Sequence, residues 1–339
     1  MIKSTRAFSH AACRLVPPIP TMESPDHILL GDAVELKLES GSRPAKDVRF
    51  KLESELNLTY GEISALAGDF YGTWSPISDP PNEDERTRRF ISAWDSLAKK
   101  STLQPKEGEK IMKIIKDQHH AVGKAIKEAK PISDVYADAK WNLNFLAATQ
   151  DRAKLGQATY YDLAMLDWDH FGSDAEIAYK TGHFAAMEVA TSKKEPATLY
   201  AAYAMNAFAD HFLQDSFSAG HVRTPRRALH LVDGKHLLDE GANMMHNEDG
   251  IKGLWVSNSG VGKSGWMMYG DREFSTEKNK VNRDYCQKAI QASADEIYTA
   301  WSDQRLQHSC NALQYLPSKE SAFDSRNHKP LWSLVKRAT

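Results

Sequence analysis

The sequence predicts an all-α protein, built as a multi-helix bundle with a small β-hairpin insertion and an irregular N-terminal extension. Apolar residues recur at helical spacing through most of the chain after about residue 56. A glycine-rich stretch near residues 253–272 interrupts this pattern and is typical of a hairpin. The first 55 residues are mixed, and their VPPIP stretch is incompatible with a helix. We therefore expect an extension over 1–55 and a helical domain over 56–339.

The elements follow from local pattern. HILLGDAVELKLES alternates enough to indicate a strand or short hairpin. Ile63, Leu66 and Phe70 repeat at helical spacing, which predicts a helix over 57–72 that closes at a glycine. The pattern of apolar residues at helical spacing resumes near residue 84, and Pro131 interrupts it. The remaining expected elements are an alanine-rich helix ending at Gly220, the hairpin near 253–272 and a last helix over 278–303.

Composition narrows the functional class. The chain has 339 residues, 41% of them hydrophobic, which is enough for a sizeable core. Its formal net charge of −2 argues against a nucleic-acid partner. No apolar run approaches the roughly 18 residues of a membrane span, and no standard signal peptide is visible. The cysteines, Cys13, Cys286 and Cys310, make no disulfide framework, although the last two can still pair.

The stretch HFLQDSFSAGHVRTPR concentrates the residue types of a metal site. His211 and Asp215 are four residues apart, so a helix places them on one face. An imidazole nitrogen and a carboxylate oxygen so placed can hold one ion at about 2.0–2.2 Å. Asp215 can also bridge to a second ion, and His221, just past Gly220, can turn toward it. For any single pair of this kind, a core histidine beside a solvated carboxylate is the alternative.

Other segments add candidates of the same type. His170 ends an apolar stretch, and Asp69 is expected inside an apolar helix, where an unpaired carboxylate is costly. His246 lies beside Glu248 and Asp249. Several such clusters in one helical chain favour a buried metal centre over surface charge.

Here the chain resembles the zinc-dependent phospholipase C family, in particular its bacterial branch that cleaves phosphatidylcholine. The same all-helical fold also carries zinc nucleases that cut single strands. The resemblance covers roughly residues 57–272, and its most specific motif is an ungapped His-x3-Asp-x5-His. The matching stretches are LTYGEISALAGDFYG, DHFGSDAEIAYKTGHFAAMEVA, HFLQDSFSAGHVRTPR and MMHNEDGIKGLWVSNSGVGKSGWMMYGD.

The resemblance implies two or three zinc ions. The ligands it implies are Asp69, His170, His211 and Asp215 around one zinc, and His221, His246 and Asp249 around another. Asp249 is our choice of carboxylate because a residue three positions after His246 shares its helical face. His236 and Glu240 form a competing pair.

Two histidines outside this set also follow from the resemblance. Family members hold one ion with the N-terminal amine of the mature chain and a nearby histidine. Here an extension precedes the matching text, so His10 or His27 is the candidate substitute. We expect His183 to contact the metal ligands without binding an ion itself, and the alternative is an ordinary place in the core.

The activity implied is hydrolysis of a glycerophospholipid by metal-activated water, which releases diacylglycerol and a phosphorylated head group. Asp69 would also be catalytic, by orienting or deprotonating the water. Arg223 would contact the phosphate, with a solvated basic turn as the alternative. Phe70 and Tyr71 would stack on the choline group, with a place in the hydrophobic core as the alternative.

The partner implied is a phospholipid at a membrane surface, and an exported protein is expected. The alternatives are a single-strand nuclease of the same fold and a catalytically inactive helical binding protein.

Overall fold

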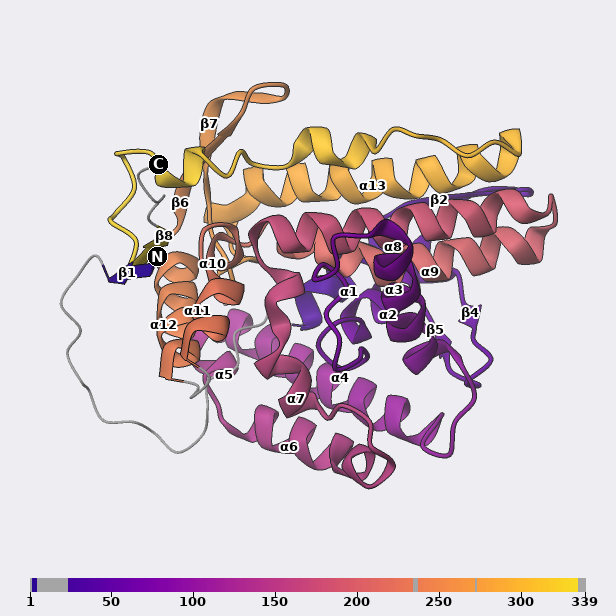
Figure 1. Ribbon diagram of the computed structural model, residues 1–339, viewed down its shortest axis with the longest axis horizontal. Coiled ribbons are helices and arrows are strands. Elements are labelled where there is room, and N and C mark those ends of the chain that lie inside the picture. Colours follow the sequence, from indigo (N-terminus) through magenta and orange to yellow (C-terminus); the bar gives the residue numbers. More distant parts are fainter. Residues whose placement is uncertain (1, 5–23, 234–236, 272, 335–339) are drawn as a thin grey trace.

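The computed structural model describes residues 2–4, 24–233, 237–271 and 273–334. This part of the chain is mostly helical, with short strands in antiparallel pairs (Figure 1). The prediction of an all-α protein with a small β-hairpin is therefore confirmed at the level of fold class.

The helices and strands have these bounds. The helices are α1 (Ser24–Asp32), α2 (Tyr60–Leu66), α3 (Glu83–Ala98), α4 (Lys106–Lys127), α5 (Ile132–Tyr136), α6 (Lys140–Thr149), α7 (Tyr160–Met165), α8 (Gly172–Ser192), α9 (Pro196–Asp215), α10 (Ala219–Val222), α11 (Arg226–Asp233), α12 (Leu237–Lys252) and α13 (Lys280–Asp303). The strand pairs are β1 (Ile2–Ser4) with β8 (Trp332–Leu334), β2 (Glu35–Leu38) with β3 (Gly41–Pro44), β4 (Phe50–Lys51) with β5 (Asn57–Leu58), and β6 (Leu254–Asn258) with β7 (Gly262–Met268).

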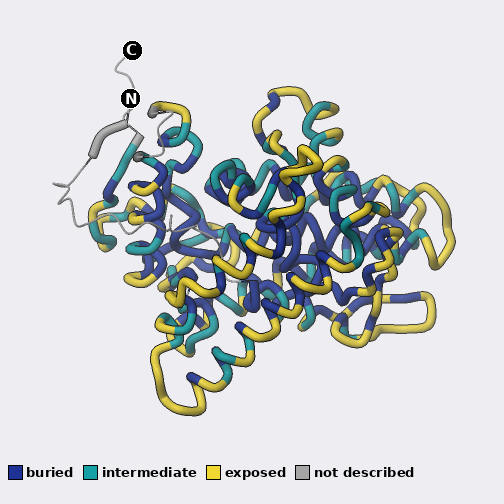
Figure 2. Tube along the Cα trace, turned by 90° about the horizontal axis from the view of Figure 1, so that it is seen from below, coloured by how far each residue is buried: buried dark blue, intermediate teal, exposed yellow. Residues whose placement is uncertain are grey.

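The long helices α8, α9 and α13 pack side by side across the upper part of the view in Figure 1. Helix α9 is the most deeply placed, since every residue from Ala202 to Asp215 is buried. Its many alanines let neighbouring helices approach closely, and buried residues run through the interior of the molecule (Figure 2). The metal-ligand candidates of α9 are thus held in a fully buried, close-packed part of the core.

Residues 24–55, expected as an irregular extension, pack into the same hydrophobic core as the helices. Leu30, Leu36 and Phe50 are all buried in it. Helix α1 lies against α2 and takes up the first part of HILLGDAVELKLES, which the sequence predicts to be extended. Only Glu35–Leu38 of that stretch is a strand, β2, and it pairs with β3 just beyond it, with Glu35 opposite Pro44. A boundary near residue 55 therefore does not separate two cores. The part of the extension over 5–23 lies outside the described residues.

Two helix ends differ from the sequence-based expectation. The helix expected over 57–72 is only α2, which begins at a capping box of Thr59 and Glu62. Gly68, with φ at +64°, turns the chain, so Asp69 lies in a turn and not inside a helix. Helix α9 ends at Asp215 instead of Gly220, because the main chain tightens into shorter-range turn bonds at Phe217 and Ser218.

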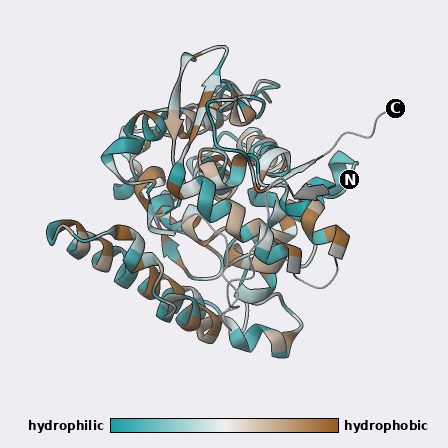
Figure 3. Cartoon of the chain, turned by 90° about the vertical axis from the view of Figure 1, so that its left-hand side faces the viewer, coloured by the Kyte–Doolittle hydropathy of each residue, from teal (hydrophilic) through white to brown (hydrophobic). Residues whose placement is uncertain are grey.

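The hairpin near 253–272 is confirmed as β6 and β7, which pair from Leu254 opposite Met268. Most helices carry hydrophilic and hydrophobic residues along the same element, as expected when one face meets the core (Figure 3). Among the described residues, no helix combines the length and the hydropathy that a membrane crossing requires.

Candidate metal centre

Histidine and aspartate side chains from seven segments converge inside the molecule. They come from α1, the turn after α2, the 3-10 turn Asp167–His170, α9, α10, α12 and the segment after β7. The side chains are His27, Asp69, His170, His211, Asp215, His221, His246 and Asp271, and each is 5% exposed or less. We call this set the metal centre.

Asp215 lies in the middle of the metal centre. One of its carboxylate oxygens, Oδ2, lies 2.8 Å from His170 Nδ1 and 3.4 Å from His211 Nε2. The other, Oδ1, lies 3.7 Å from His27 Nε2 and 3.7 Å from His221 Nδ1. The carboxylate therefore faces histidines on both sides, as a bridging ligand would.

Asp271 occupies the equivalent place at the other end of the metal centre. Its Oδ2 lies 2.9 Å from His246 Nε2 and 3.8 Å from His221 Nε2. Its Oδ1 accepts a hydrogen bond of 2.7 Å from Ser218, which fixes the orientation of the carboxylate. His221, His246 and Asp271 thus form a compact group of nitrogen and oxygen donors.

Gly68 lets the chain approach the histidines closely enough to bring Asp69 into the metal centre. A Cβ at this position would lie 2.6 Å from His170 Cε1 and 2.7 Å from His211 Nε2. Its left-handed backbone is also one that other residues rarely adopt. Asp69 groups with His27 and His211 as potential ligands of one ion.

Hydrogen bonds on the outer side of the rings set their tautomers. The Nδ1–H of His27 donates to Gln214 Oε1 at 2.7 Å, and that of His211 donates to the carbonyl oxygen of Ser64 at 2.9 Å. His221 Nδ1 likewise donates to a main-chain carbonyl oxygen at 2.8 Å. These three rings therefore keep their proton on Nδ1 and direct the Nε2 lone pair inward, the arrangement found for metal-binding histidines.

Many inward-facing atoms have no hydrogen-bond partner among the described residues. These buried atoms are His27 Nε2, Asp69 Oδ1, Asp215 Oδ1, His221 Nε2, His246 Nε2 and Asp271 Oδ2. A buried polar atom without a partner is costly, and so many in one place need a common explanation. Divalent cations fit, because every one of these atoms is a nitrogen or carboxylate oxygen that zinc binds.

The charges agree with a cation site. Burial raises the pKa of Asp69 well above its ordinary value, so a cation is needed to keep it ionised. Burial lowers the pKa of His211, which keeps this ring neutral and able to bind metal. Burial would also lower the pKa of His170, but Asp215 raises it to about 9. Burial alone would raise the pKa of Asp215, whereas His211 and the other nearby histidines hold it below its usual range.

Asp249, our choice of carboxylate beside His246, lies outside the metal centre. It forms a buried, two-pronged ion pair with Arg223, at 2.7 and 2.8 Å, and its Oδ1 lies 2.8 Å from His328. The carboxylate that faces His246 is that of Asp271, which lies beyond the β6–β7 hairpin, where no helical spacing links it to His246. His27 joins as one of the two candidates for the N-terminal position. His10 and His236 lie outside the described residues, and Glu240 is exposed on α12.

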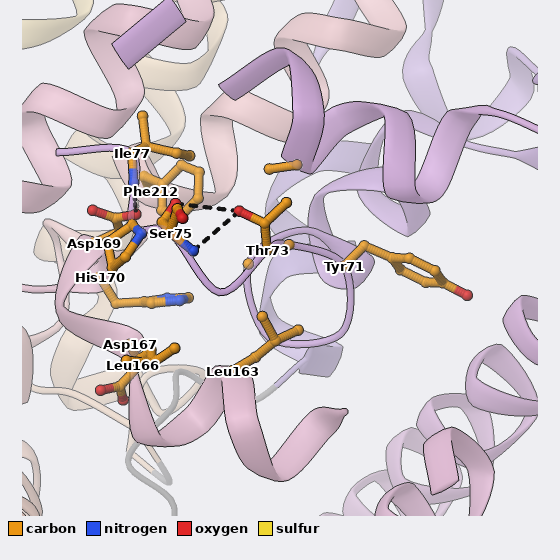
Figure 4. Close-up of a pocket in the computed structure, with 14 residues that line it drawn as sticks. Tyr71, Thr73, Ser75, Ile77, Leu163, Leu166, Asp167, Asp169, His170 and Phe212 are labelled. Carbon is orange, nitrogen blue, oxygen red and sulfur yellow. Dashed lines mark hydrogen bonds between the residues drawn. The ribbon is translucent and has the colours of Figure 1, made fainter. Parts of the chain in front are cut away.

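The expected substrate-binding residues are engaged elsewhere. Arg223 is buried against Asp249, so it does not present a free guanidinium to a phosphate. Phe70 is buried in the core and stacks on Tyr160 at 5.3 Å between ring centroids. The Tyr71 ring carries the Arg152 guanidinium, and it points away from the His170 side of the pocket (Figure 4). The alternative of core aromatics therefore holds for Phe70 and Tyr71, whereas Arg223 is neither a free phosphate ligand nor part of a solvated basic turn, because it is buried.

A small pocket of about 40 Å³ leads to the metal centre beside Gly68 and His170 (Figure 4). Its lining includes Asp167 and Asp169. Asp169 accepts main-chain hydrogen bonds from Ile77 and Ser78, which hold the loop over the pocket. The pocket therefore lies against one side of the metal centre, where His170 lines it.

His183 does not contact the metal centre. Its ring bonds Asn206 and faces Glu296, in a different part of the core. The expectation that it supports the metal ligands is therefore wrong, and its alternative place in the core is correct.

Comparison with family models, with curated proteins and with solved structures finds no match to this chain.

Proposed function

We propose that this protein is a zinc-dependent phosphodiester hydrolase of the phospholipase C type, acting on glycerophospholipids such as phosphatidylcholine. The observation that supports it most is the convergence of unpartnered, buried histidine and aspartate atoms from segments far apart in the chain. A structural zinc site is usually closed by four ligands and rich in cysteine. This one contains no sulfur ligand and more donors than one ion uses, which favours a hydrolytic centre.

The proposed metal ligands fall into two groups according to their position in the metal centre. His27, Asp69, His170, His211 and Asp215 would hold ions at one end, and His221, His246 and Asp271 at the other. Zinc ions bound there would lower the pKa of a water molecule toward about 7 and neutralise charge on a phosphoryl group. Asp69 has an unpartnered oxygen, Oδ1, through which it can orient that water and accept its proton.

The pocket lining supports a phospholipid over a polynucleotide. It contains no lysine or arginine, which a strand of phosphates would require. Its apolar side chains include Leu163 and Leu166, which suit a lipid. Its carboxylates are engaged elsewhere, since Asp167 pairs with Arg226 and Asp169 accepts main-chain hydrogen bonds.

The test combines metal analysis with product release. Purified protein would be assayed for zinc by mass spectrometry and for phosphocholine released from phosphatidylcholine vesicles. We expect at least two zinc ions per chain, and loss of both zinc and activity in Asp215→Asn. The control is Asp117→Asn, since Asp117 is an exposed residue of α4 that pairs only with its own helix.

Three outcomes would reject the proposal. One is a zinc-loaded protein that leaves vesicles intact but cuts single-stranded DNA, which would identify a nuclease. Another is a zinc-loaded protein that cleaves neither substrate. The third is activity that survives Asp215→Asn unchanged.

A further inference from the structure

A second buried cluster of metal-ligand types lies between α8 and α13, apart from the metal centre. It consists of His183 on α8, Glu296 on α13 and Cys310 on the segment that follows α13. One potential ligand atom from each residue lies within 4.8 Å of the other two. His183 Nε2 and Glu296 Oε2 are 3.3 Å apart, and both residues are almost fully buried.

The hydrogen bonds around His183 determine where its proton lies. Tyr60 and Ser293 donate their hydroxyl protons to Asp210, so their oxygens accept from the Asn206 amide nitrogen. This leaves the Asn206 oxygen to accept from His183 Nδ1 at 2.7 Å. His183 Nδ1 therefore carries the proton, and Nε2 presents a lone pair.

That lone pair faces a carboxylate oxygen, which is an unfavourable contact unless a cation lies between them. His183 Nε2 makes no hydrogen bond despite its 3.3 Å distance from Glu296 Oε2. The geometry is therefore poor for a second ring proton shared with the carboxylate. A metal ion placed to one side of the line between the two atoms is compatible with their 3.3 Å separation, because two ligand atoms of one zinc ion also lie several ångströms apart.

Glu296 brings a negative charge that the described residues do not balance with a lysine or arginine. Its oxygens accept hydrogen bonds from the main-chain N–H of Asn311 at 3.0 Å, and Oε1 also accepts from Ser309 at 3.2 Å. These bonds orient the carboxylate but do not neutralise it. Burying an ionised carboxylate is costly unless it pairs with a cation or binds a metal.

Cys310 supplies a sulfur at the open side of the cluster. It is free, as is Cys286, so the pairing of these two cysteines that the sequence allowed does not occur. Within the part of the chain that the structure describes, its thiol donates one long hydrogen bond, of 3.6 Å, to the Tyr179 hydroxyl. Unlike His183 and Glu296, Cys310 is partly exposed, so an ion and a water ligand can enter from its side.

We propose that His183 Nε2, a Glu296 oxygen and the Cys310 sulfur bind one zinc ion, separate from the metal centre. Imidazole, carboxylate and thiolate together form a donor set that selects zinc over the harder cations. The thiol releases its proton to solvent when the metal binds. The ion would join α8, α13 and the segment around residue 310, which ties the end of the described chain to the central helices. This site takes no part in the proposed hydrolysis.

Cobalt(II) gives a specific test, because sulfur bound to cobalt produces a charge-transfer absorption in the near ultraviolet. None of the residues of the metal centre has a sulfur atom, so this band reports on a cysteine ligand outside it, and the variants identify which cysteine. We expect the band in the full-length wild-type protein loaded with Co2+, its loss in Cys310→Ser, and its retention in Cys286→Ser. In zinc-loaded protein, Cys310→Ser should contain about one equivalent of zinc less than Cys286→Ser.

A measurement on the wild type alone covers the case in which the variant does not fold. Cys310 would be alkylated with and without a zinc chelator, and its modification would be followed by peptide mass spectrometry. We expect zinc to protect it and the chelator to expose it. Absence of the cobalt band in the wild type, a band that persists in Cys310→Ser, or alkylation indifferent to zinc would overturn the proposal. None of these outcomes depends on lipid cleavage, so the two proposals can fail separately.

Discussion

At the residue scale, the metal centre depends on carboxylates whose charge has no other partner. Asp215 and Asp271 face histidines, and each has one oxygen without a hydrogen bond among the described residues. Asp249 looks equivalent in sequence, but its carboxylate forms an ion pair with Arg223. An aspartate can therefore face metal-ligand histidines or form a structural ion pair, and the neighbouring side chains determine which.

We expect Asp271→Asn to lower zinc affinity by about 100-fold or more, since changes to metal-site residues commonly cost about 10–100-fold even outside the ligand shell. The amide keeps the size of the side chain but removes the charge that faces His221 and His246. Competition with a chromogenic chelator would measure the affinity. Unchanged zinc affinity in the folded variant would exclude Asp271 as a ligand.

Arg223→Ala is expected to act on stability and not on chemistry. Removing one partner of a buried ion pair leaves the Asp249 carboxylate with only His328 beside it among the described residues, and the loss of such a partner costs about 3–5 kcal/mol. Urea unfolding should show this loss, while zinc content per folded chain stays at the wild-type level. A normally stable variant with a raised KM for lipid would instead restore Arg223 as a phosphate-binding residue.

At the element scale, the close crossing of α1 and α2 positions two parts of the metal centre. A Cβ at Gly31 would lie 2.6 Å from the Gly61 Cα, and a Cβ at Gly61 would meet the main-chain oxygen of Ile28. Helix α1 carries His27, and the turn after α2 carries Asp69. The contact between these helices therefore sets the distance between the two side chains.

Gly61→Ala should separate the helices and lower the free energy of unfolding by about 1–3 kcal/mol, the usual cost of overpacking. Zinc occupancy should fall with it. Gly123→Ala on α4 is the matched control, because a Cβ there meets nothing within 4 Å. That control should be neutral or stabilising by up to about 1 kcal/mol. Equal stability of the two variants would contradict the role given to this crossing.

At the scale of the whole molecule, the proposed metal binding would be linked to folding. The metal centre joins segments from α1 to the region after β7, so ions bound there stabilise the folded state alone. A ligand present at about 1,000 times its Kd adds about 4 kcal/mol of stability. Several ions held in one core should therefore make a large contribution to the stability of the fold.

Treatment with a strong chelator should accordingly lower the Tm by several degrees or more. Readdition of Zn2+ should restore it, whereas Mg2+ should not, since imidazole ligands suit zinc and not magnesium. Differential scanning calorimetry would measure both steps. A Tm that is the same with and without chelator, in protein shown to have lost its metal, would contradict the link.

The sequence by itself determined the helical class, the hairpin near 253–272 and the shared face of His211 and Asp215. These features depend on interactions between near neighbours, so spacing of about two or 3.6 residues reveals them. It also singled out residues that the structure brings together, Asp69, His170, His221 and His246 among them.

Only the tertiary structure decided which other residues complete the metal centre and which leave it. Asp271 meets His246 across a hairpin, and His27 reaches Asp215 from a helix nearly two hundred positions away, so no local period connects either pair. Arg223 and Tyr71 lost their expected roles because burial gave them nearer partners, Asp249 and Arg152. Charge pairing in a core is settled by distance in space, and distance in space between remote segments is a property of the fold.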